Sequence, residues 1–239
     1  MKLVNLLFRA VLILIFVGGQ TLISQGQKST PKNPEKTIIH FSELKFTDIG
    51  KPTISGSKII HRDTISIIAG GADIWGKHDE FYFGYKELSG DFDVTIQVLS
   101  LGAAHKYTKA GIMARVDISD SSQHVFYQVF PDNSARNKNN GGCEFQYRLI
   151  KGGDMKAIYP DPATAGNQFN VSYPNTFIRL KRKGDLFESY FSNDNKTWKL
   201  YASLSLKVPD KLLVGPAVTS HNKSDYTTAM FGPLFFLNK

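Results

Sequence analysis

The sequence predicts an all-β protein, a sandwich of two antiparallel sheets. The first observation is two-residue alternation: the rings of Phe81, Phe83 and Tyr85 share one face, because side chains alternate along an extended strand. The second is that such runs recur at short intervals, separated by Gly, Asn, Asp and Pro, the residues of turns. The third is that no stretch after residue 26 has the apolar spacing of an amphipathic helix of three turns.

The domain is organised around the stretch from Gly70 to Val98. A double glycine opens it, the aromatic strand 81–85 follows, and Ser89-Gly90-Asp91 supplies turn chemistry before a second strand. We expect the face with Phe81, Phe83 and Tyr85 to be buried, and the unit to be antiparallel with one face packed and one face wet. In the second strand the predicted inward residues are Phe92, Val94, Ile96 and Val98, and the outward residues are Asp93, Thr95 and Gln97.

Further runs of alternating residues complete the predicted sheets. Residues 109–116 place Ala110, Ile112 and Ala114 on one face, with Lys109, Met113 and Arg115 on the other. Residues 124–129 carry apolar side chains on both faces, so we expect cover on both sides. The remaining predicted strands are 37–41, 58–61, 64–68, 144–149, 177–182, 186–191, 197–206, 212–218 and 227–237. Two irregular stretches, 131–142 and 152–175, are long for a compact domain and are expected to take part in recognition.

The first 35 residues are predicted to lie outside the folded domain. Residues 1–26 have the pattern of a signal peptide: Lys2 and Arg9 are basic, 10–17 is apolar, and Ser24-Gln25-Gly26 is a small-x-small cleavage pattern. The apolar run is shorter than the ~20 residues that span a bilayer, so no membrane span is expected after cleavage. We therefore expect export to the periplasm or the extracellular space. Residues 27–35 form a polar, proline-containing linker, and 36–239 form one sandwich domain.

Charge and cysteine content limit the classes of function. The chain has a formal net charge of +8, but its basic residues are spread out, so a nucleic-acid partner is not expected of an exported protein. A solvated basic surface is one interpretation, and a preference for acidic glycans or cell-envelope polymers is the alternative. Cys143 is the sole cysteine, which excludes an intrachain disulfide, and we expect its thiol to be buried and inert.

Seven short motifs occur in a characteristic order. They are Ala72-Asp73-Ile74-Trp75-Gly76, Gly90-Asp91-Phe92-Asp93-Val94, Lys109-Ala110-Gly111-Ile112-Met113-Ala114-Arg115, Phe145-Gln146-Tyr147-Arg148, Arg179-Leu180-Lys181-Arg182-Lys183-Gly184, Ser192-Asn193-Asp194 with Trp198, and Val218-Thr219-Ser220-His221-Asn222. In this order they resemble the concanavalin A-like lectin/glucanase superfamily, in its uncharacterised regulation-of-enolase-like group, which is similar to the C-terminal module of family 43 xylosidases. The resemblance covers Thr64 to Leu237 and implies a jelly-roll β-sandwich of two antiparallel sheets.

The chain departs from this family pattern at two places. Tyr107-Thr108 precedes the Lys-Ala-Gly run where the family usually has a Trp, which puts a family-wide aromatic contact in doubt. Asp194-Asn195 stands in the late hairpin where the family favours Asp-Gly. Because Asn tolerates the left-handed conformation nearly as well as Gly, we expect the hairpin to form.

Catalytic and metal signatures are weak. Catalytic members of the superfamily place their acids as Glu-x-Asp-x-x-Glu on one strand, a motif this sequence lacks, and it has no Gly-x-Ser-x-Gly. The histidines are scattered without zinc-binding spacing. Calcium is the one plausible metal, because hard oxygen ligands suit that ion and four aspartates fall within a short segment, although turn capping explains each equally well. These weak calcium candidates are Asp73, Asp79, Asp91 and Asp93.

Sugar binding requires exposed rings beside polar groups, since rings stack on sugars while amides and charged groups hold the hydroxyls. Trp75 lies in a glycine-flanked loop near His78 and Asp79, and is the best ring for this role. We expect Arg115, Gln128, Gln146 and Arg148 to line one outward sheet surface. Tyr107 and His221 complete the predicted ligand-binding set, and Tyr159 and Tyr173 are additional loop rings that could serve as platforms.

The sequence therefore predicts a secreted, non-catalytic module that binds a carbohydrate or glycoconjugate, with no cofactor beyond a possible structural calcium. Two alternatives remain open. One is a divergent glycoside hydrolase or lyase of the same fold, which needs two acids of shifted pKa across a cleft. The other is a structural or adhesion module that binds protein through a contiguous apolar patch.

Overall fold

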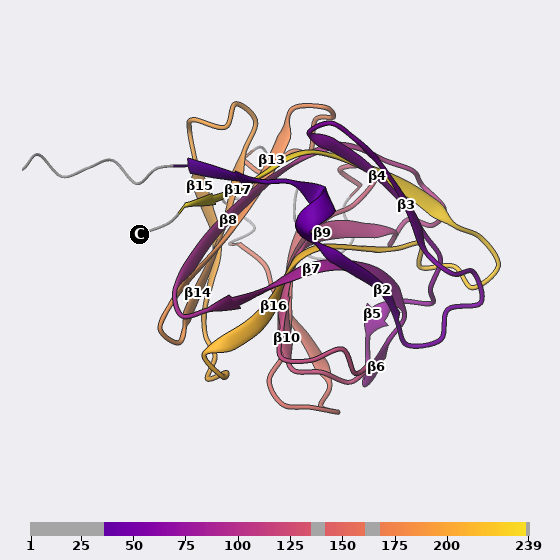
Figure 1. Cartoon of the computed structure of the whole chain (residues 1–239), viewed down its shortest axis with the longest axis horizontal. Helices are drawn as coiled ribbons and strands as arrows, with labels where there is room; N and C mark the ends of the chain where they lie inside the picture. The colour runs from indigo at the N-terminus through magenta and orange to yellow at the C-terminus, as the bar shows by residue number, and fades with distance from the viewer. Residues whose placement is uncertain (1–35, 135–141, 161–167, 238–239) are drawn as a thin grey trace, which may run out of the picture. The chain divides into compact units, whose positions relative to one another are not determined.

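A computed structural model describes residues 36–134, 142–160 and 168–237 (Figure 1). The predicted signal peptide, 1–26, and linker, 27–35, lie outside the described residues. Contacts divide the chain into Met1–Asn33 and Pro34–Lys239, and all of the described residues belong to the second unit. In the described ranges no helix is long and apolar enough to cross a membrane.

The first large sheet has the strand order β15-β14-β13-β8-β17-β4-β3, and β1 also pairs with β17 (Figure 1). All of its pairs are antiparallel. Its strands are β1 (Lys36–Ile39), β3 (Ser57–His61), β4 (Thr64–Ala69), β8 (Phe92–Leu101), β13 (Thr176–Lys183), β14 (Leu186–Ser192), β15 (Lys199–Ser205) and β17 (Thr227–Leu237).

The second large sheet has the order β12-β11-β10-β9-β16-β7-β2 and is also antiparallel. Its strands are β2 (Lys45–Ile49), β7 (Phe81–Ser89), β9 (Lys109–Arg115), β10 (His124–Val129), β11 (Cys143–Arg148), β12 (Met155–Ile158) and β16 (Lys211–Thr219). A 3-10 turn, η1 (Phe41–Glu43), links β1 to β2, and β5 (Ile74–Trp75) pairs with β6 (His78–Asp79) as a small hairpin. The predicted all-β sandwich of two antiparallel sheets is confirmed.

The main core is formed by apolar side chains from both large sheets. In β8 the predicted inward residues Phe92, Val94, Ile96 and Val98 are all buried in it, because they alternate with polar residues along an extended strand. Residues of β9 and β10 join from the second sheet, in the alternation that the sequence predicted. Cys143 is buried in the same cluster, as expected of an inert thiol.

The aromatic strand β7 differs from the prediction in one respect. Phe81 and Phe83 are fully buried, but they belong to a second, smaller cluster with Ile74 of β5, and Tyr82 is the ring that joins the main core. Both faces of β7 are therefore covered at this end, so the expectation of one wet face is wrong here. The cause is non-local: the segment that carries the β5–β6 hairpin packs over the strand.

That second cluster defines what we call the outer face of the second sheet, the face turned away from the main core. On β9 this face carries Lys109, Met113 and Arg115, and on β11 it carries Glu144, Gln146 and Arg148. The strands β9 and β10 are buried along their entire length. Because this face is covered at one end and open at the other, it positions the candidate site.

Candidate functional site

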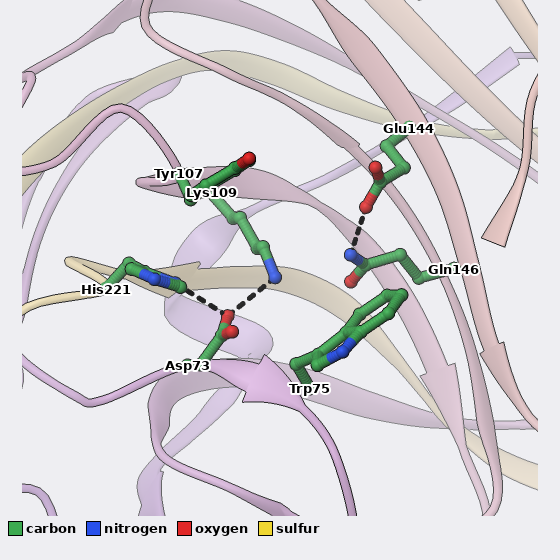
Figure 2. Close-up of a pocket in the computed structure, with 7 residues that line it drawn as sticks. All are labelled: Asp73, Trp75, Tyr107, Lys109, Glu144, Gln146 and His221. Carbon is green, nitrogen blue, oxygen red and sulfur yellow. Dashed lines mark hydrogen bonds and ion pairs between the residues drawn. The ribbon is translucent and has the colours of Figure 1, made fainter. Parts of the chain in front are cut away.

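A pocket of about 290 Å³ opens on the outer face of the second sheet (Figure 2). The sheet supplies its floor, and three connecting segments supply its walls. These are the β4–β5 connection with the β5–β6 hairpin, the loop before β9, and the loop after β16. The lining residues are Asp73, Trp75, Tyr107, Lys109, Glu144, Gln146 and His221.

Two side chains of β11 form the polar floor. Glu144 and Gln146 stand on the same face because they are two residues apart on a strand. The carboxylate of Glu144 accepts hydrogen bonds from the amides of Gln146 and Gln128, and from the hydroxyl of Tyr159 at 2.8 Å. The amide oxygen Oε1 of Gln146 is buried and has no hydrogen-bond partner among the described residues. Its capacity to accept a hydrogen bond is therefore unused within the described part of the chain.

Lys109, at the start of β9, forms one side of the pocket and is only 3% exposed. Its Nζ donates to Asp73 Oδ1 at 2.6 Å and to the carbonyl oxygen of Ile74 at 3.1 Å. The same ammonium lies 5.6 Å from the centre of the Trp75 ring. An ammonium has three donors, so within the described part of the chain one remains beyond these two bonds.

Asp73 joins the segment before β5 to the sheet. Burial acts to raise the pKa of its carboxyl, but the charge of Lys109 and hydrogen bonds from His221 and Lys109 outweigh it, so the pKa lies below its ordinary value. Nδ1 of His221 lies 3.0 Å from Asp73 Oδ1. Asp73 is therefore ionised at neutral pH and compensates the charge of Lys109.

Trp75 is the exposed ring of the pocket, with 42% of its surface accessible. It stands on β5, immediately before Gly76, whose positive φ of 64° turns the chain into β6. Arg148 Nη2 donates to the Gly76 carbonyl at 3.1 Å, and the two guanidinium nitrogens of Arg148 each lie 2.7 Å from an oxygen of Asp79. These bonds from Arg148 therefore hold the hairpin that presents Trp75 against β11.

Aromatic rings from two loops close the remaining side. The rings of His105 and His221 are stacked with their centres 4.4 Å apart, and the centre of the Tyr107 ring lies 5.4 Å from that of His221. The hydroxyl of Thr108 donates to the Ser220 carbonyl at 2.8 Å, which ties the two loops together. The pocket therefore combines rings on its rim with fixed polar groups on its floor.

Comparisons with known proteins give a fold but no sequence family. No family model matches the chain, and no curated protein does. A functionally unknown protein from Saccharomyces cerevisiae is similar in structure, with a TM-score of 0.62 and 15% identity over 84% of this chain and 99% of that one. The carbohydrate-binding module CBM66 from Bacillus subtilis matches with a TM-score of 0.50 and 14% identity, over 81% and 95% of the two chains.

A third similar structure is a GH43 protein, BlXynB from Bacillus licheniformis, with a TM-score of 0.54 and 10% identity. The match covers 81% of this chain but only 39% of that one. The chain has the concanavalin A-like jelly-roll fold. The jelly-roll β-sandwich that the motif resemblance implied is therefore confirmed, and at these identities the likeness shows the fold alone.

The concanavalin A-like domain brings four of the predicted ligand-binding residues into the pocket. Trp75, Tyr107, Gln146 and His221 all line it, although they come from four separate segments of the chain. Asp73, predicted only as a weak calcium ligand, lines it as well. Of the other tyrosines, Tyr159 supports Glu144 from behind, and Tyr173 donates to the Phe130 carbonyl at 2.6 Å.

The structure corrects the sequence prediction for Arg115 and Arg148. Both were expected on an exposed sheet surface, and both are fully buried. They lie on the predicted face, but the β5–β6 hairpin and the loop 116–123 cover that face, and Asp79, itself buried, pairs with both guanidinium groups. Burial lowers the pKa of Arg115 to about 10, although Asp79 acts in the opposite direction. These groups hold the site together and do not line it.

Three more predictions differ from the structure. Asp79 is buried beneath the hairpin, where it holds the arginines and not a ligand. His78 points to solvent and its Nδ1 lies 3.1 Å from Asp120, outside the pocket. Gln128 lies on the predicted face but is fully buried behind Glu144.

The four calcium candidates do not converge. Asp73 pairs with Lys109 and Asp79 with Arg148, while Asp91 accepts from the Gly184 amide at 2.7 Å and Asp93 pairs with Arg179. In the described part of the chain no group of three His, Cys, Asp or Glu side chains is placed to hold a metal ion. Ion pairing and turn capping account for these aspartates, so the calcium prediction is wrong for this set.

Sequence reasoning missed Lys109 and Glu144. The alternation already placed Lys109 on the outer face of its strand, and Glu144 is two residues from Gln146. A charged residue at such a position is ordinarily solvated, so neither was distinguishable as a pocket residue. The alternation pattern could have indicated them, because it places Lys109 and Glu144 on the sheet face that also carries Gln146.

Proposed function

We propose that this domain binds a carbohydrate or glycoconjugate in the pocket around Trp75, without catalysing a reaction on it, as an exported protein. The observation that carries the proposal is an exposed indole ring beside two hydrogen-bonding groups that the described residues leave unused, Gln146 Oε1 and one donor of Lys109. Rings stack on the apolar faces of sugars while such groups hold the hydroxyls. Export rests on the sequence of residues 1–26 alone.

The fold supports the proposal without deciding it. A carbohydrate-binding module is among the similar structures, at an identity that speaks for fold only. The pocket itself is small and largely pre-formed, since its polar groups are buried and hydrogen-bonded to the sheet. Pre-formed concave sites with few, fixed polar groups are typical of small-ligand binding.

The test is a glycan and polysaccharide panel with the mature protein and two variants. Trp75→Ala should weaken binding of any positive glycan about ten-fold or more, because a lost ring contact is worth about 1 kcal/mol beyond its buried area. Ile59→Ala is the matched control, since Ile59 is 63% exposed on β3 of the other sheet. Binding that Trp75→Ala leaves unchanged would contradict the assigned pocket. No binding across the panel would remove the proposal and favour a protein-binding module.

One observation favours a second function, glycoside hydrolysis. Asp73 and Glu144 lie on opposite sides of the pocket (Figure 2), and two carboxylates across a bound sugar are what that reaction requires. Against it, Asp73 is held ionised by Lys109, and Glu144 is engaged by three neutral donors. Reducing-sugar release that Glu144→Gln abolishes, with binding retained, would establish the hydrolase. The binding proposal expects no release.

A further inference from the structure

We infer that the pocket selects an uncharged polyhydroxylated ring, with a hydroxyl held between Lys109 and Gln146, and that it discriminates against acidic sugars. This inference rests on the proposed function and names the ligand chemistry of the same site. It runs against the formal net charge of +8, which by itself suggests an acidic partner.

The first step is the charge balance within the pocket. The charge of Lys109 is compensated by Asp73, 2.6 Å away. The carboxylate of Glu144, only 4% exposed, receives hydrogen bonds from the neutral groups of Gln146, Gln128 and Tyr159, and no cation pairs with it among the described residues. The lining is therefore neutral or negative, and an incoming carboxylate, sulfate or phosphate would face Glu144 where water screens poorly.

The second step is the orientation of the Gln146 amide. The carboxylate of Glu144 is only an acceptor when ionised, so the group of Gln146 that faces it must be the NH₂. The amide oxygen consequently faces the pocket, where it is buried and unpartnered among the described residues. The free group of Gln146 is therefore an acceptor, and a ligand must donate a hydrogen bond to match it.

The third step is the pairing of this acceptor with a donor. In Figure 2 the ammonium of Lys109 and the amide oxygen of Gln146 point toward each other across the pocket, beside the ring of Trp75. A hydroxyl both accepts and donates, so a sugar hydroxyl matches the two groups together. An anionic oxygen has no proton for Gln146, and an ammonium has no acceptor for Lys109. A hydroxyl therefore satisfies both groups, whereas a carboxylate or an ammonium in the same place satisfies only one of them.

The volume of the pocket determines the size of the sugars to be tested. About 290 Å³ is at the lower end of the roughly 300–1,000 Å³ of ligand pockets, so single sugar rings are suitable ligands. Each hexose is tested beside its own uronic acid, namely glucose, galactose and mannose with their acidic derivatives. Binding is followed by saturation-transfer NMR and by tryptophan fluorescence at neutral pH.

We expect at least one neutral hexose to bind about ten-fold or more tightly than its uronic acid. Gln146→Met removes the acceptor without changing charge and should weaken that hexose about ten-fold. Glu144→Gln should raise the affinity for the uronic acid relative to the hexose, because it removes the uncompensated carboxylate. Thermal unfolding of each variant checks that it folds. Should Glu144→Gln not fold, the affinity of the unmodified protein for the hexose must stay constant as salt is raised.

The outcomes separate this inference from the proposed function. A uronic acid that binds more tightly than its hexose, and loses binding in Trp75→Ala, overturns the charge argument while carbohydrate binding stands. Hexose affinity unchanged in Gln146→Met overturns the role of the amide oxygen. Absence of Trp75-dependent binding by every probe and every glycan of the panel overturns both.

Discussion

Replacing Arg148 with methionine should destabilise the domain and loosen the hairpin that carries Trp75. Arg148 is fully buried, and its guanidinium nitrogens make two 2.7 Å bonds to Asp79. They also donate to the carbonyl oxygens of Gly76 at 3.1 Å, Ser122 at 3.1 Å and Gly153 at 3.0 Å. Methionine keeps much of the volume and removes every one of these donors.

The size of the effect depends on the charge that the variant leaves behind. Removing one partner of a buried ion pair costs about 3–5 kcal/mol, because the other charge stays buried without compensation. Here Arg115 Nη2 lies 3.8 Å from Asp79 and keeps that carboxylate partly paired. We therefore expect the lower end, about 3 kcal/mol, which for a domain of about 200 residues lowers Tm by about 6–12 °C.

Urea and thermal unfolding of Arg148→Met and of a control give the measurement. Lys86→Met breaks the pair with Glu43, whose side chains are 40% and 42% exposed, and should cost about 1 kcal/mol or less. Glycan binding is measured on the folded variant below its Tm, where a loosened Gly76 turn should weaken it. Equal losses of stability in the two variants would refute the argument that burial makes the Arg148 pair strong.

Three further predictions concern single residues. Burial lowers the pKa of His124 from 6.5 to about 4, so between these values the unfolded chain binds a proton that the folded chain does not. The free energy of unfolding should therefore fall by roughly 2 kcal/mol from pH 7.5 to pH 5. In urea titrations His124→Gln should reduce this loss, and the control His61→Gln, at an exposed position, should not. Burial raises the pKa of Cys143 to about 12, so a thiol reagent should label it only in denaturant, and labelling of the native protein would contradict its burial. Asn195 has a φ of 57°, in the left-handed region that a β-branched residue adopts only with strain. Asn195→Gly should therefore leave Tm nearly unchanged, while Asn195→Val should lower stability by about 1–2 kcal/mol. Equal Tm values for the two variants would argue against that conformation.

The fold was predictable because its signal is local. Alternation along β8 placed Phe92, Val94 and Ile96 correctly in the core, and the turn residue Asn195 adopts the left-handed conformation expected of it. The same alternation says which residues share a face, but not what lies over that face. Phe81 and Phe83 were therefore correctly expected to be buried, while the assignment of a wet opposite face was wrong.

The site was predictable only in part, for the same reason. Arg148 and Gln146 are two residues apart on one strand face, and nothing in their local sequence distinguishes the buried from the pocket-lining one. The distinction comes from Asp79, 69 residues away from Arg148 in the sequence, which closes one end of the outer face. Trp75 was singled out because its flanking glycines indicate a loop, and the structure shows that its ring is exposed.

The two aspartates on either side of Trp75 explain why this ring is available to a ligand. Asp73 precedes β5 and pairs with Lys109 of β9, while Asp79 ends β6 and pairs with Arg148 of β11. The hairpin is thus pinned to the sheet at both of its ends, and its exposed residue is held between two ion pairs. A ring ordered in this way loses little freedom on binding, so more of its stacking energy appears as affinity. The charged residues first interpreted as ligand contacts or a calcium site therefore form the frame of the pocket, and the uncharged groups between them, Trp75 and Gln146, are the ones we propose contact the ligand.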